Sequence, residues 1–558
     1  MKSISSFLIT LLLSISLGFS QNHYGKNGMV SSASTYASQA GIEILKDGGN
    51  AVDASVATAF TLAVTWPFAG NLGGGGFMVI HTGEGNVTTF DFREKAPLAS
   101  TKDMFLDEKG NLKSGSNHYS ALAIGVPGTV AGLYDAHQKY GKIPWEKLLE
   151  RAIQLAEYGF PLPKSLANDF LYFAKNLDQF PEMQSFIERD GQVVEFGEYW
   201  KQPALAETLK KIQKEGKTAF YEGEVAETMV EYIQSQDGIV TLEDLKQYEA
   251  IERAPIHSIF KNYELYGMPL PSSGGVAVTQ MMNMWEHLEE TPTMGSVQYY
   301  HTLAEIMRKA FKDRAQYLGD ADFIDIPELE KLLSEDYAGE LLKEVDFEQA
   351  GKSDSNDLQL ISEGQETTHL SVMDQNGMAV SLTTTLEQGY GVKMQSPKLG
   401  FLFNNEMGDF NAVPEKTTNS GQIGTPANII APGKRMLSSM SPFIVMKNDI
   451  PFLVIGSPGG RTIINTVFQT ILATTVYDFP MAEAIEAAKI HHQWLPDQIT
   501  YEKYKMSPEA LDALESMGHE LQMRTFLGRL MGIKFNAETG YMEGAADSNS
   551  PDGGVASY

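Results

Sequence analysis

The feature that most constrains this chain is a polar segment that runs directly into a pair of alternating strands. Residues 343–366 are polar and irregular, most clearly at 351–357, and this composition is typical of an exposed loop or linker. From Thr368 the hydrophobic period changes to two, and a second alternating run covers 379–383. The turn sequence Asp-Gln-Asn-Gly at 374–377 joins the two runs and predicts a β-hairpin. A linker that leads into a core strand is typical of an internal processing site, although most linkers are never cut.

Threonines are concentrated in this predicted hairpin, at 367–368 and 383–385. A threonine hydroxyl is a poor nucleophile without a neighbouring base, and the chain has no cysteine to take its place. One solution is to free the α-amino group of the threonine by cutting the preceding peptide bond, because an α-amine titrates at about pH 8 and accepts a proton readily. Strand pairing would place the Thr385 hydroxyl opposite Thr367. At this point the alternative, that β-branched threonines simply favour strands, stays open.

Length and charge limit the classes of function. With 558 residues, the chain is long enough for two to four domains or for one large intertwined unit. It has 71 acidic and 43 basic residues and a formal charge of -28. Such a surface repels nucleic acid and anionic lipid, so we expect neither as a partner. The absence of cysteine removes disulfides and thiolate metal sites.

The N-terminal residues have the pattern of a secretory signal peptide. Lys2 supplies a positive charge, residues 7–19 are apolar apart from small polar residues, and Ser20 ends a small-residue cleavage site. The apolar stretch is shorter than the roughly 20 residues that cross a membrane, and no later stretch is long enough, so we expect no stable membrane insertion. We therefore expect residues 1–20 to be a signal peptide and the mature protein to be exported, periplasmic or extracellular. An uncleaved anchor is the alternative.

A glycine run at 70–76 precedes the strand-like residues 77–80. A phosphate-binding loop requires a helix after the glycines and a Lys-Ser/Thr pair, and neither is present. We therefore expect tight backbone packing near a buried site. Before this run, residues 32–65 have helical periodicity, and Asp-Gly-Gly-Asn at 47–50 divides them into two predicted helices.

The middle of the chain, residues 143–342, has mostly the periodicity of amphipathic helices, for example at 145–158 and 299–317. Later, His491 and His492 stand next to each other in a segment that we interpret as helical. Adjacent residues on a helix point in different directions, and no carboxylate at a ligand spacing accompanies them. We therefore interpret both histidines as structural and expect no metal.

Taken together, the motifs resemble those of γ-glutamyltranspeptidases, a family of N-terminal-nucleophile hydrolases, over essentially the whole chain after the leader. The signature consists of Thr367-Thr368-His369-x-Ser371, Gly377, Val380, Thr383-x-Thr385-Leu386-Glu387 and Tyr390-Gly391. The resemblance implies an α+β fold, a four-layer αββα sandwich formed jointly by two chains cut from one precursor. These would be a large subunit, 21–366, and a small catalytic subunit, 367–558. It also implies cleavage between Glu366 and Thr367, with Thr367 as the nucleophile of both reactions and Thr385 as its hydrogen-bond partner.

The family's substrate carries an α-carboxylate and an α-ammonium, so its pocket needs both charges. Arg93, in the segment 91–97, matches the arginine that binds the α-carboxylate, and its planar fork suits two carboxylate oxygens. The resemblance assigns Ser438 and Ser439 to the carboxylate, Glu387, Glu406 and Asp409 to the ammonium, and Gly459 and Gly460 to an oxyanion hole. The glycine turn follows an apolar strand and precedes an apolar helix, where backbone N–H groups point outward. No cofactor is implied.

The implied substrates are glutathione and other γ-glutamyl amides, with water or an amino acid or dipeptide as acceptor. A related acylase that acts on glutaryl or cephalosporin side chains would share the fold but would have no ammonium to bind, and a catalytically inactive exported binding protein would share only the fold. Three departures stand out: some relatives carry an amide at Glu387 or Glu406, Met378 replaces a small polar residue, and the lid-like stretch 411–430 has Ser420 where an aromatic latch stands in some members.

Overall fold

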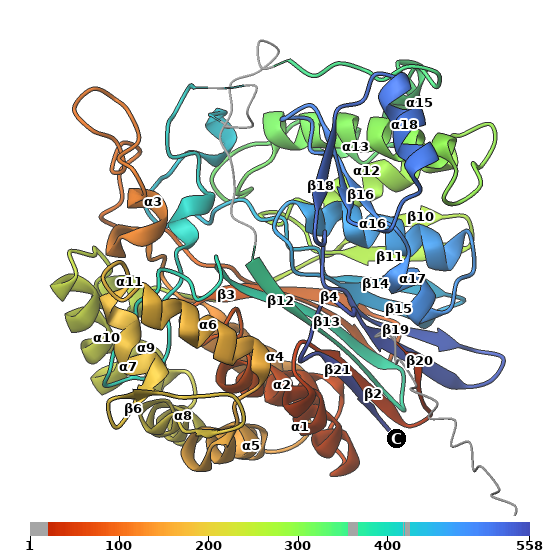
Figure 1. The fold of residues 1–558 in the computed structure, drawn as a ribbon. Coiled ribbons are helices and arrows are strands. Elements are labelled where there is room, and N and C mark those ends of the chain that lie inside the picture. Colours follow the sequence, from red (N-terminus) through yellow and green to blue (C-terminus); the bar gives the residue numbers. More distant parts are fainter. Residues whose placement is uncertain (1–20, 355–365, 417, 419–423) are drawn as a thin grey trace, which may run out of the picture.

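Two antiparallel sheets pack face to face, and helices cover both outer faces (Figure 1). The computed structural model describes residues 21–354, 366–416, 418 and 424–558. The predicted αββα sandwich is therefore confirmed. The expected signal peptide and Ser420 of the lid-like stretch lie outside the described residues.

The first sheet, called the hairpin sheet below, contains the predicted hairpin near its centre. The hairpin strands β12 and β13 pair with each other, and β2 and β3 flank them. In spatial order the strands are β21 (Gly554–Ser557), β2 (Gly28–Ser32), β12 (Glu366–Asp374), β13 (Met378–Glu387), β3 (Gly75–Thr82), β4 (Val87–Phe92) and β9 (Ile251–Arg253).

The second sheet, called the β15 sheet, packs on the inner face of the hairpin sheet through β14, β15, β19 and β20. In spatial order its strands are β1 (His23–Gly25), β20 (Tyr541–Ala546), β19 (Met531–Asn536), β15 (Ile450–Gly456), β14 (Phe443–Lys447), β11 (Tyr263–Gly267) and β10 (Ile256–Phe260).

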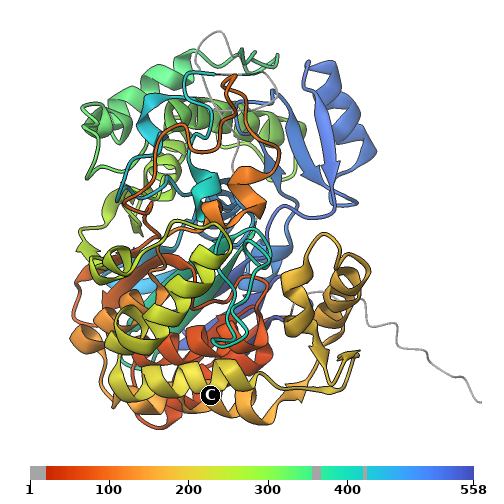
Figure 2. The same ribbon diagram turned by 90° about the vertical axis from the view of Figure 1, so that its left-hand side faces the viewer.

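The helices form two outer layers (Figure 1, Figure 2). The layer on the hairpin sheet includes α1 (Thr35–Lys46), α2 (Ala51–Thr65), α4 (Thr129–Tyr140), α5 (Trp145–Tyr158) and α8 (Pro203–Glu215), and the layer on the β15 sheet includes α12 (Gly274–Glu286), α13 (Val297–Tyr317), α16 (Thr462–Thr475) and α17 (Met481–Glu486). Other helices are α3 (Ser116–Tyr119), α6 (Lys164–Lys175), α7 (Gln184–Ile187), α9 (Thr218–Tyr221), α10 (Gly223–Ser235), α11 (Leu242–Lys246), α14 (Leu329–Leu332), α15 (Glu335–Lys343) and α18 (Pro508–Ser516). Within the described residues, no helix combines the length and apolar character that a membrane crossing requires.

Polar side chains of the two hairpin strands hold the two sheets together. Ser371 donates to the carbonyls of Val454 and Met531 at 3.2 and 3.1 Å, and Ser381 donates to the carbonyl of Ile455 at 2.9 Å. The ring of His369 hydrogen-bonds Thr383 Oγ1 at 2.8 Å and Ser371 Oγ at 3.0 Å, and burial lowers its pKa to about 3, so the ring is neutral. These contacts fix β15, and therefore the glycine turn that follows it, relative to the nucleophile strand.

Most of the predicted local structure is confirmed. The helices divide at 47–50 as expected, and an Asn50–Asp53 capping box starts α2. The middle of the chain is mostly helical, as expected, and it also contains the short strands β9, β10 and β11. One expectation was wrong: His491 ends a short buried strand, β16 (Ile490–His491), instead of lying on a helix.

Candidate active site

Thr367 is the second residue of β12, where the ladder with β13 becomes irregular. Its partner across the hairpin is Thr385, as predicted, and both are buried. The register shifts between Glu366 and Thr367, so the irregular step coincides with the bond expected to be cut. Such irregularities redirect side chains and are common beside active sites. The Thr385 Oγ1 accepts a hydrogen bond from the Glu387 N–H at 2.8 Å, which orients the hydroxyl.

The glycine run at 70–76 holds the end of β13 in place. Asn71 Nδ2 donates to the carbonyl of Thr385 at 2.9 Å and to Thr384 Oγ1 at 3.0 Å. A Cβ added at Gly74 would lie 2.1 Å from the Thr385 carbonyl oxygen, so no side chain fits there. The expectation of tight backbone packing near a buried site is confirmed.

The predicted oxyanion turn reaches the same place from the β15 sheet. Gly459 and Gly460 have φ values of +137° and +58°, where glycine is favoured. The Thr462 hydroxyl donates to the Gly459 carbonyl at 2.8 Å as α16 begins. Because backbone N–H groups at a helix N-terminus favour negative charge, this turn can stabilise an oxyanion formed beside it.

Arg93 lies within a group of buried acids at the end of β4. Its Nη1 is 2.5 Å from Glu406 Oε2 and 3.3 Å from Glu94 Oε2, and its Nη2 pairs with Asp409. Burial alone would lower the pKa of Arg93, but these negative charges raise it above its ordinary value. Burial in turn raises the pKa of Glu94 to about 7 and holds that of Glu406 well above its usual range. The residues assigned to opposite charges of a substrate are thus paired with each other.

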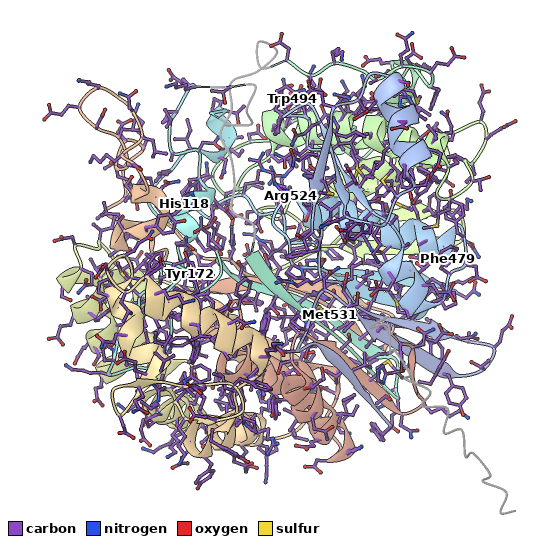
Figure 3. The ribbon with its side chains drawn as sticks, viewed as in Figure 1. His118, Tyr172, Phe479, Trp494, Arg524 and Met531 are labelled. Atoms are coloured by element: carbon purple, nitrogen blue, oxygen red, sulfur yellow. The ribbon has the colours of Figure 1, made fainter. Side chains whose placement is uncertain are left out.

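Glu387 ends β13 beside a histidine that sequence reasoning missed. It has a φ of +78° and is buried, and a non-glycine residue in this region marks local strain that is common at functional sites. Its Oε2 lies 3.3 Å from His118 Nδ1 (Figure 3 labels His118). Burial lowers the pKa of His118, but the hydrogen bond to Glu387 and the charge of Asp409 raise it overall. His118 therefore offsets part of the negative charge of this group.

Ser438 and Ser439 lie in the loop before β14. Ser439 Oγ accepts a hydrogen bond from Arg314 Nη2 at 2.9 Å, and Ser438 Oγ accepts one from the Met440 N–H at 3.2 Å. Both serines are buried. They line the same cavity as the nucleophile and the acids Glu387 and Asp409.

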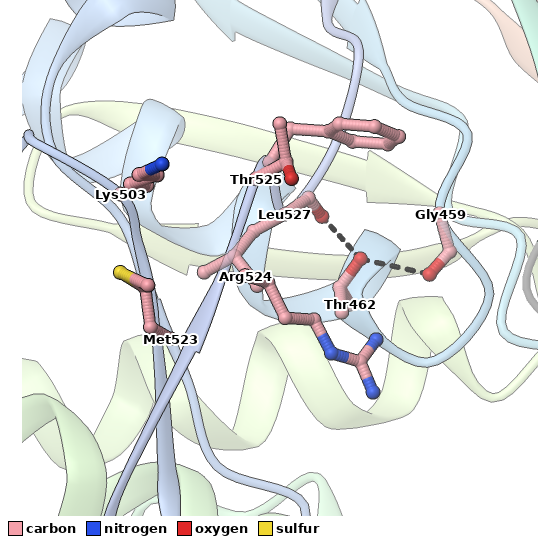
Figure 4. A pocket seen from close by; sticks show the side chains of 8 residues that line it. Gly459, Thr462, Lys503, Met523, Arg524, Thr525 and Leu527 are labelled. Carbon is pink, nitrogen blue, oxygen red and sulfur yellow. Dashed lines mark hydrogen bonds between the residues drawn. The ribbon is translucent and has the colours of Figure 1, made fainter.

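One small cavity, of about 20 Å³, brings most of the predicted residues together. Its lining consists of Arg93, Thr367, Thr385, Glu387, Asp409, Ser438, Ser439, Met440, Gly460 and Ile463. Of the predicted catalytic and substrate-binding residues, two are not part of this lining: Glu406 pairs with Arg93, and Gly459 lines a neighbouring pocket of about 450 Å³ together with Thr462 and Arg524 (Figure 4). The two cavities share the glycine turn as a common wall.

A separate buried group, His301, Glu305 and His519, has ligand-type atoms that lie within 4.8 Å of one another. His301 Nδ1 and His519 Nε2 are hydrogen-bonded to each other at 2.8 Å, and Glu305 pairs with Arg308. Within the described residues, the two histidines therefore bind each other and the glutamate binds an arginine. The absence of a metal site stays a prediction.

Two functional neighbours were missed, for different reasons. Glu94 directly follows Arg93, and its position in the segment 91–97 that matches the family could have identified it. His118 lies on the four-residue helix α3, far from Glu387 in sequence, and only the tertiary fold brings it within 3.3 Å. No local pattern could have revealed it.

Comparison with known proteins agrees with this geometry. The family model for gamma-glutamyltranspeptidase matches residues 37–557. A glutathione hydrolase proenzyme from Escherichia coli (strain K12) is 41% identical over 537 residues, which cover 96% of this chain and 92% of the relative. A solved cephalosporin acylase from Bacillus halodurans matches with a TM-score of 0.85 at 26% identity, covering 96% of this chain and 97% of that chain. A solved γ-glutamyltranspeptidase from Helicobacter pylori has a TM-score of 0.54 at 38% identity, covering 56% of this chain and 90% of that chain. The chain belongs to the γ-glutamyltranspeptidase family.

Proposed function

We propose that this chain is an exported precursor that cuts itself between Glu366 and Thr367 and then acts as a glutathione hydrolase and γ-glutamyltransferase. The observation that carries the proposal is the position of Thr367. It stands opposite Thr385 in a cavity whose other walls hold a guanidinium, carboxylates and serine hydroxyls. These groups complement the α-carboxylate and α-ammonium of a γ-glutamyl group.

Substrate binding then requires Arg93 to exchange partners. Arg93 pairs with Asp409 and Glu406 in the uncut chain. The α-carboxylate of the substrate binds the guanidinium in place of the acids, and its α-ammonium binds the acids in place of the guanidinium. No charge is therefore left unpaired. The cavity of about 20 Å³ has space for about one water, so it must also enlarge.

The reaction has two halves. Thr367 Oγ attacks the γ-carbonyl carbon, and the α-amine freed by cleavage accepts the hydroxyl proton. The N–H groups of Gly459 and Gly460 stabilise the oxyanion, and Thr385 holds the attacking oxygen. The C–N bond breaks, the leaving amine takes the proton, and a γ-glutamyl ester remains on Thr367. Water, or an amino acid or dipeptide, then attacks the ester and restores the threonine.

The order of strands supports two subunits that stay together. In the hairpin sheet, β12, β13 and β21 belong to the proposed small subunit, 367–558, and the other four strands to the large subunit, 21–366. In the β15 sheet, β1, β10 and β11 come from the large subunit and the others from the small one. Both sheets therefore cross the subunit boundary, and a cut after Glu366, the first residue of β12, leaves the rest of β12 and all other strands of the two sheets paired. Residues 1–20 direct this precursor to the periplasm or the outside of the cell.

Substrate choice tests the proposal. The structural match to a cephalosporin acylase favours glutaryl amides as the second candidate substrate class. We expect kcat/KM for γ-glutamyl-p-nitroanilide to exceed that for glutaryl-p-nitroanilide by at least about 100-fold, because the second substrate leaves the acids around Arg93 without an ammonium. Equal rates would indicate the acylase, and no turnover of either by the cut protein would indicate an inactive binding protein.

The glycine turn gives a separate prediction. A Cβ at Gly459 would lie 2.5 Å from Thr462 Oγ1, so Gly459→Ala must shift the turn. We expect kcat to fall by about 10²- to 10³-fold with a smaller change in KM. Gly48→Ala is the matched control, because Gly48 also has a positive φ, with nothing within 4 Å of an added Cβ. An equal fall in kcat in both variants would contradict a role of the turn in the reaction.

A further inference from the structure

Arg314 is a buried arginine beside the two serines of the cavity. It lies on α13 and is 2% exposed. Its Nε donates a hydrogen bond to Ser273 Oγ at 2.8 Å, and its Nη2 donates one to Ser439 Oγ at 2.9 Å. Because Ser439 lines the cavity, the guanidinium stands one side chain away from the place where the substrate must bind.

The other contact of Arg314 leads to the neighbouring serine. The N–H and the hydroxyl of Ser273 both donate to the carbonyl of Ser438, at 2.8 and 2.7 Å. Ser273 therefore holds the main chain of Ser438, while Arg314 holds the side chain of Ser439. One guanidinium organises both serines from behind the cavity wall.

A hydroxyl oxygen that accepts a bond from a cation directs its own hydrogen away from that cation, and the bond polarises the O–H. We propose that Arg314 is a positioning residue that orients Ser439 toward the α-carboxylate of the γ-glutamyl group. This inference rests on the proposed function. It also has an electrostatic basis: four carboxyl groups surround Arg93 or the adjoining wall, and the charge of Arg314 behind Ser439 adds to that of Arg93 in favouring an incoming carboxylate. The four are Glu94, Glu387, Glu406 and Asp409.

The test uses a pair of substrates that differ only in the α-carboxylate. γ-Glutamyl-p-nitroanilide carries it, and 4-aminobutyryl-p-nitroanilide lacks it but keeps the ammonium. We expect Arg314→Gln to raise KM for the first about 10- to 100-fold, as loss of a charge-assisted hydrogen bond does, and to leave KM for the second unchanged. Arg314→Lys, which retains the charge, should recover part of the loss. In a Ser439→Ala background, Arg314→Gln should add little, because its effect passes through Ser439.

The matched control is Arg308→Gln, which removes another buried arginine of α13. Arg308 pairs with Glu305 and Asp497, outside the cavity, so its loss should not change the ratio of the two KM values. A parallel rise of both KM values in Arg314→Gln would show a merely structural role and overturn the inference. If Arg314→Gln does not fold, Arg314→Lys and Ser273→Ala provide the same comparison of substrates. Failure of the wild-type chain to prefer γ-glutamyl over glutaryl anilide would instead refute the proposed function.

Discussion

Thr367→Ala is expected to remain a single chain of full length and to lose at least about 10⁴-fold in activity on a γ-glutamyl anilide. The reason is that one hydroxyl serves both reactions: without it the bond after Glu366 is not attacked, and without cleavage no α-amine is available as the base. A denaturing gel reports the first effect, and initial rates report the second. Loss of both together is the result expected if Thr367 serves both reactions.

The neighbouring threonine provides the control. Thr368 pairs with Thr384 on the opposite face of the hairpin, against the layer of α2, so Thr368→Ala should be cut and should remain active. Thr367→Ser keeps a hydroxyl and should be cut, although more slowly. A Thr367→Ala protein that still splits into two chains and still turns over the anilide would refute the assignment.

Arg93→Lys is expected to raise KM for a γ-glutamyl anilide about 100-fold or more, because a single ammonium cannot hold two carboxylate oxygens as the guanidinium fork does. Arg435→Lys is the matched control. Arg435 is equally buried, but it pairs with Asp91 outside the cavity. Steady-state kinetics of the two variants measure the difference, and similar KM values would remove Arg93 from the carboxylate site.

Arg93→Met should also change how stability depends on pH. Removal of the cation leaves Glu94 and Glu406 buried without its compensating charge, which costs about 3–5 kcal/mol at neutral pH. Burial then holds the pKa of these acids above their unfolded values, as it already does with Arg93 present. Folding therefore favours their protonated forms, and the variant should lose stability as the pH rises from 5 to 8. Thermal unfolding at both pH values checks this, and a variant that is more stable at pH 8 would contradict it.

The hairpin, the two N-terminal helices and the glycine turn could be predicted because each depends on local pattern: a period of two, a period of 3.6 broken by glycines, and a strand followed by a Gly-Gly step. The position of Thr367 opposite Thr385 followed from the hairpin register alone. By contrast, β9, β10 and β11 lie in a helix-rich region. Their sequences are too short for a strand pattern to stand out from the helical periodicity around them. β9 pairs with β4 and β11 pairs with β14, both far away in the sequence, and β10 adds to the sheet through β11.

For the electrostatics of the site, the sequence predicts which charged residues are present but not how they interact. The sequence contains the arginine and the acids, and the family resemblance assigns each to one end of a substrate. It does not reveal that Arg93 pairs with Glu406 and Asp409 themselves, or that burial raises the pKa of Glu406. Those properties depend on the dielectric environment and on distances between segments that meet only in the folded chain. Arg314 and His118 escaped detection for the same reason.

The central claim is that Thr367 becomes the first residue of a subunit and carries the γ-glutamyl group. The most direct measurement is mass spectrometry of the small subunit after acid quenching of the purified protein during turnover of a γ-glutamyl anilide. The account predicts a chain of residues 367–558 that is heavier by one γ-glutamyl residue, with the added mass on the N-terminal peptide that begins at Thr367. An uncut chain, a different N-terminus, or an adduct on any other residue would contradict it.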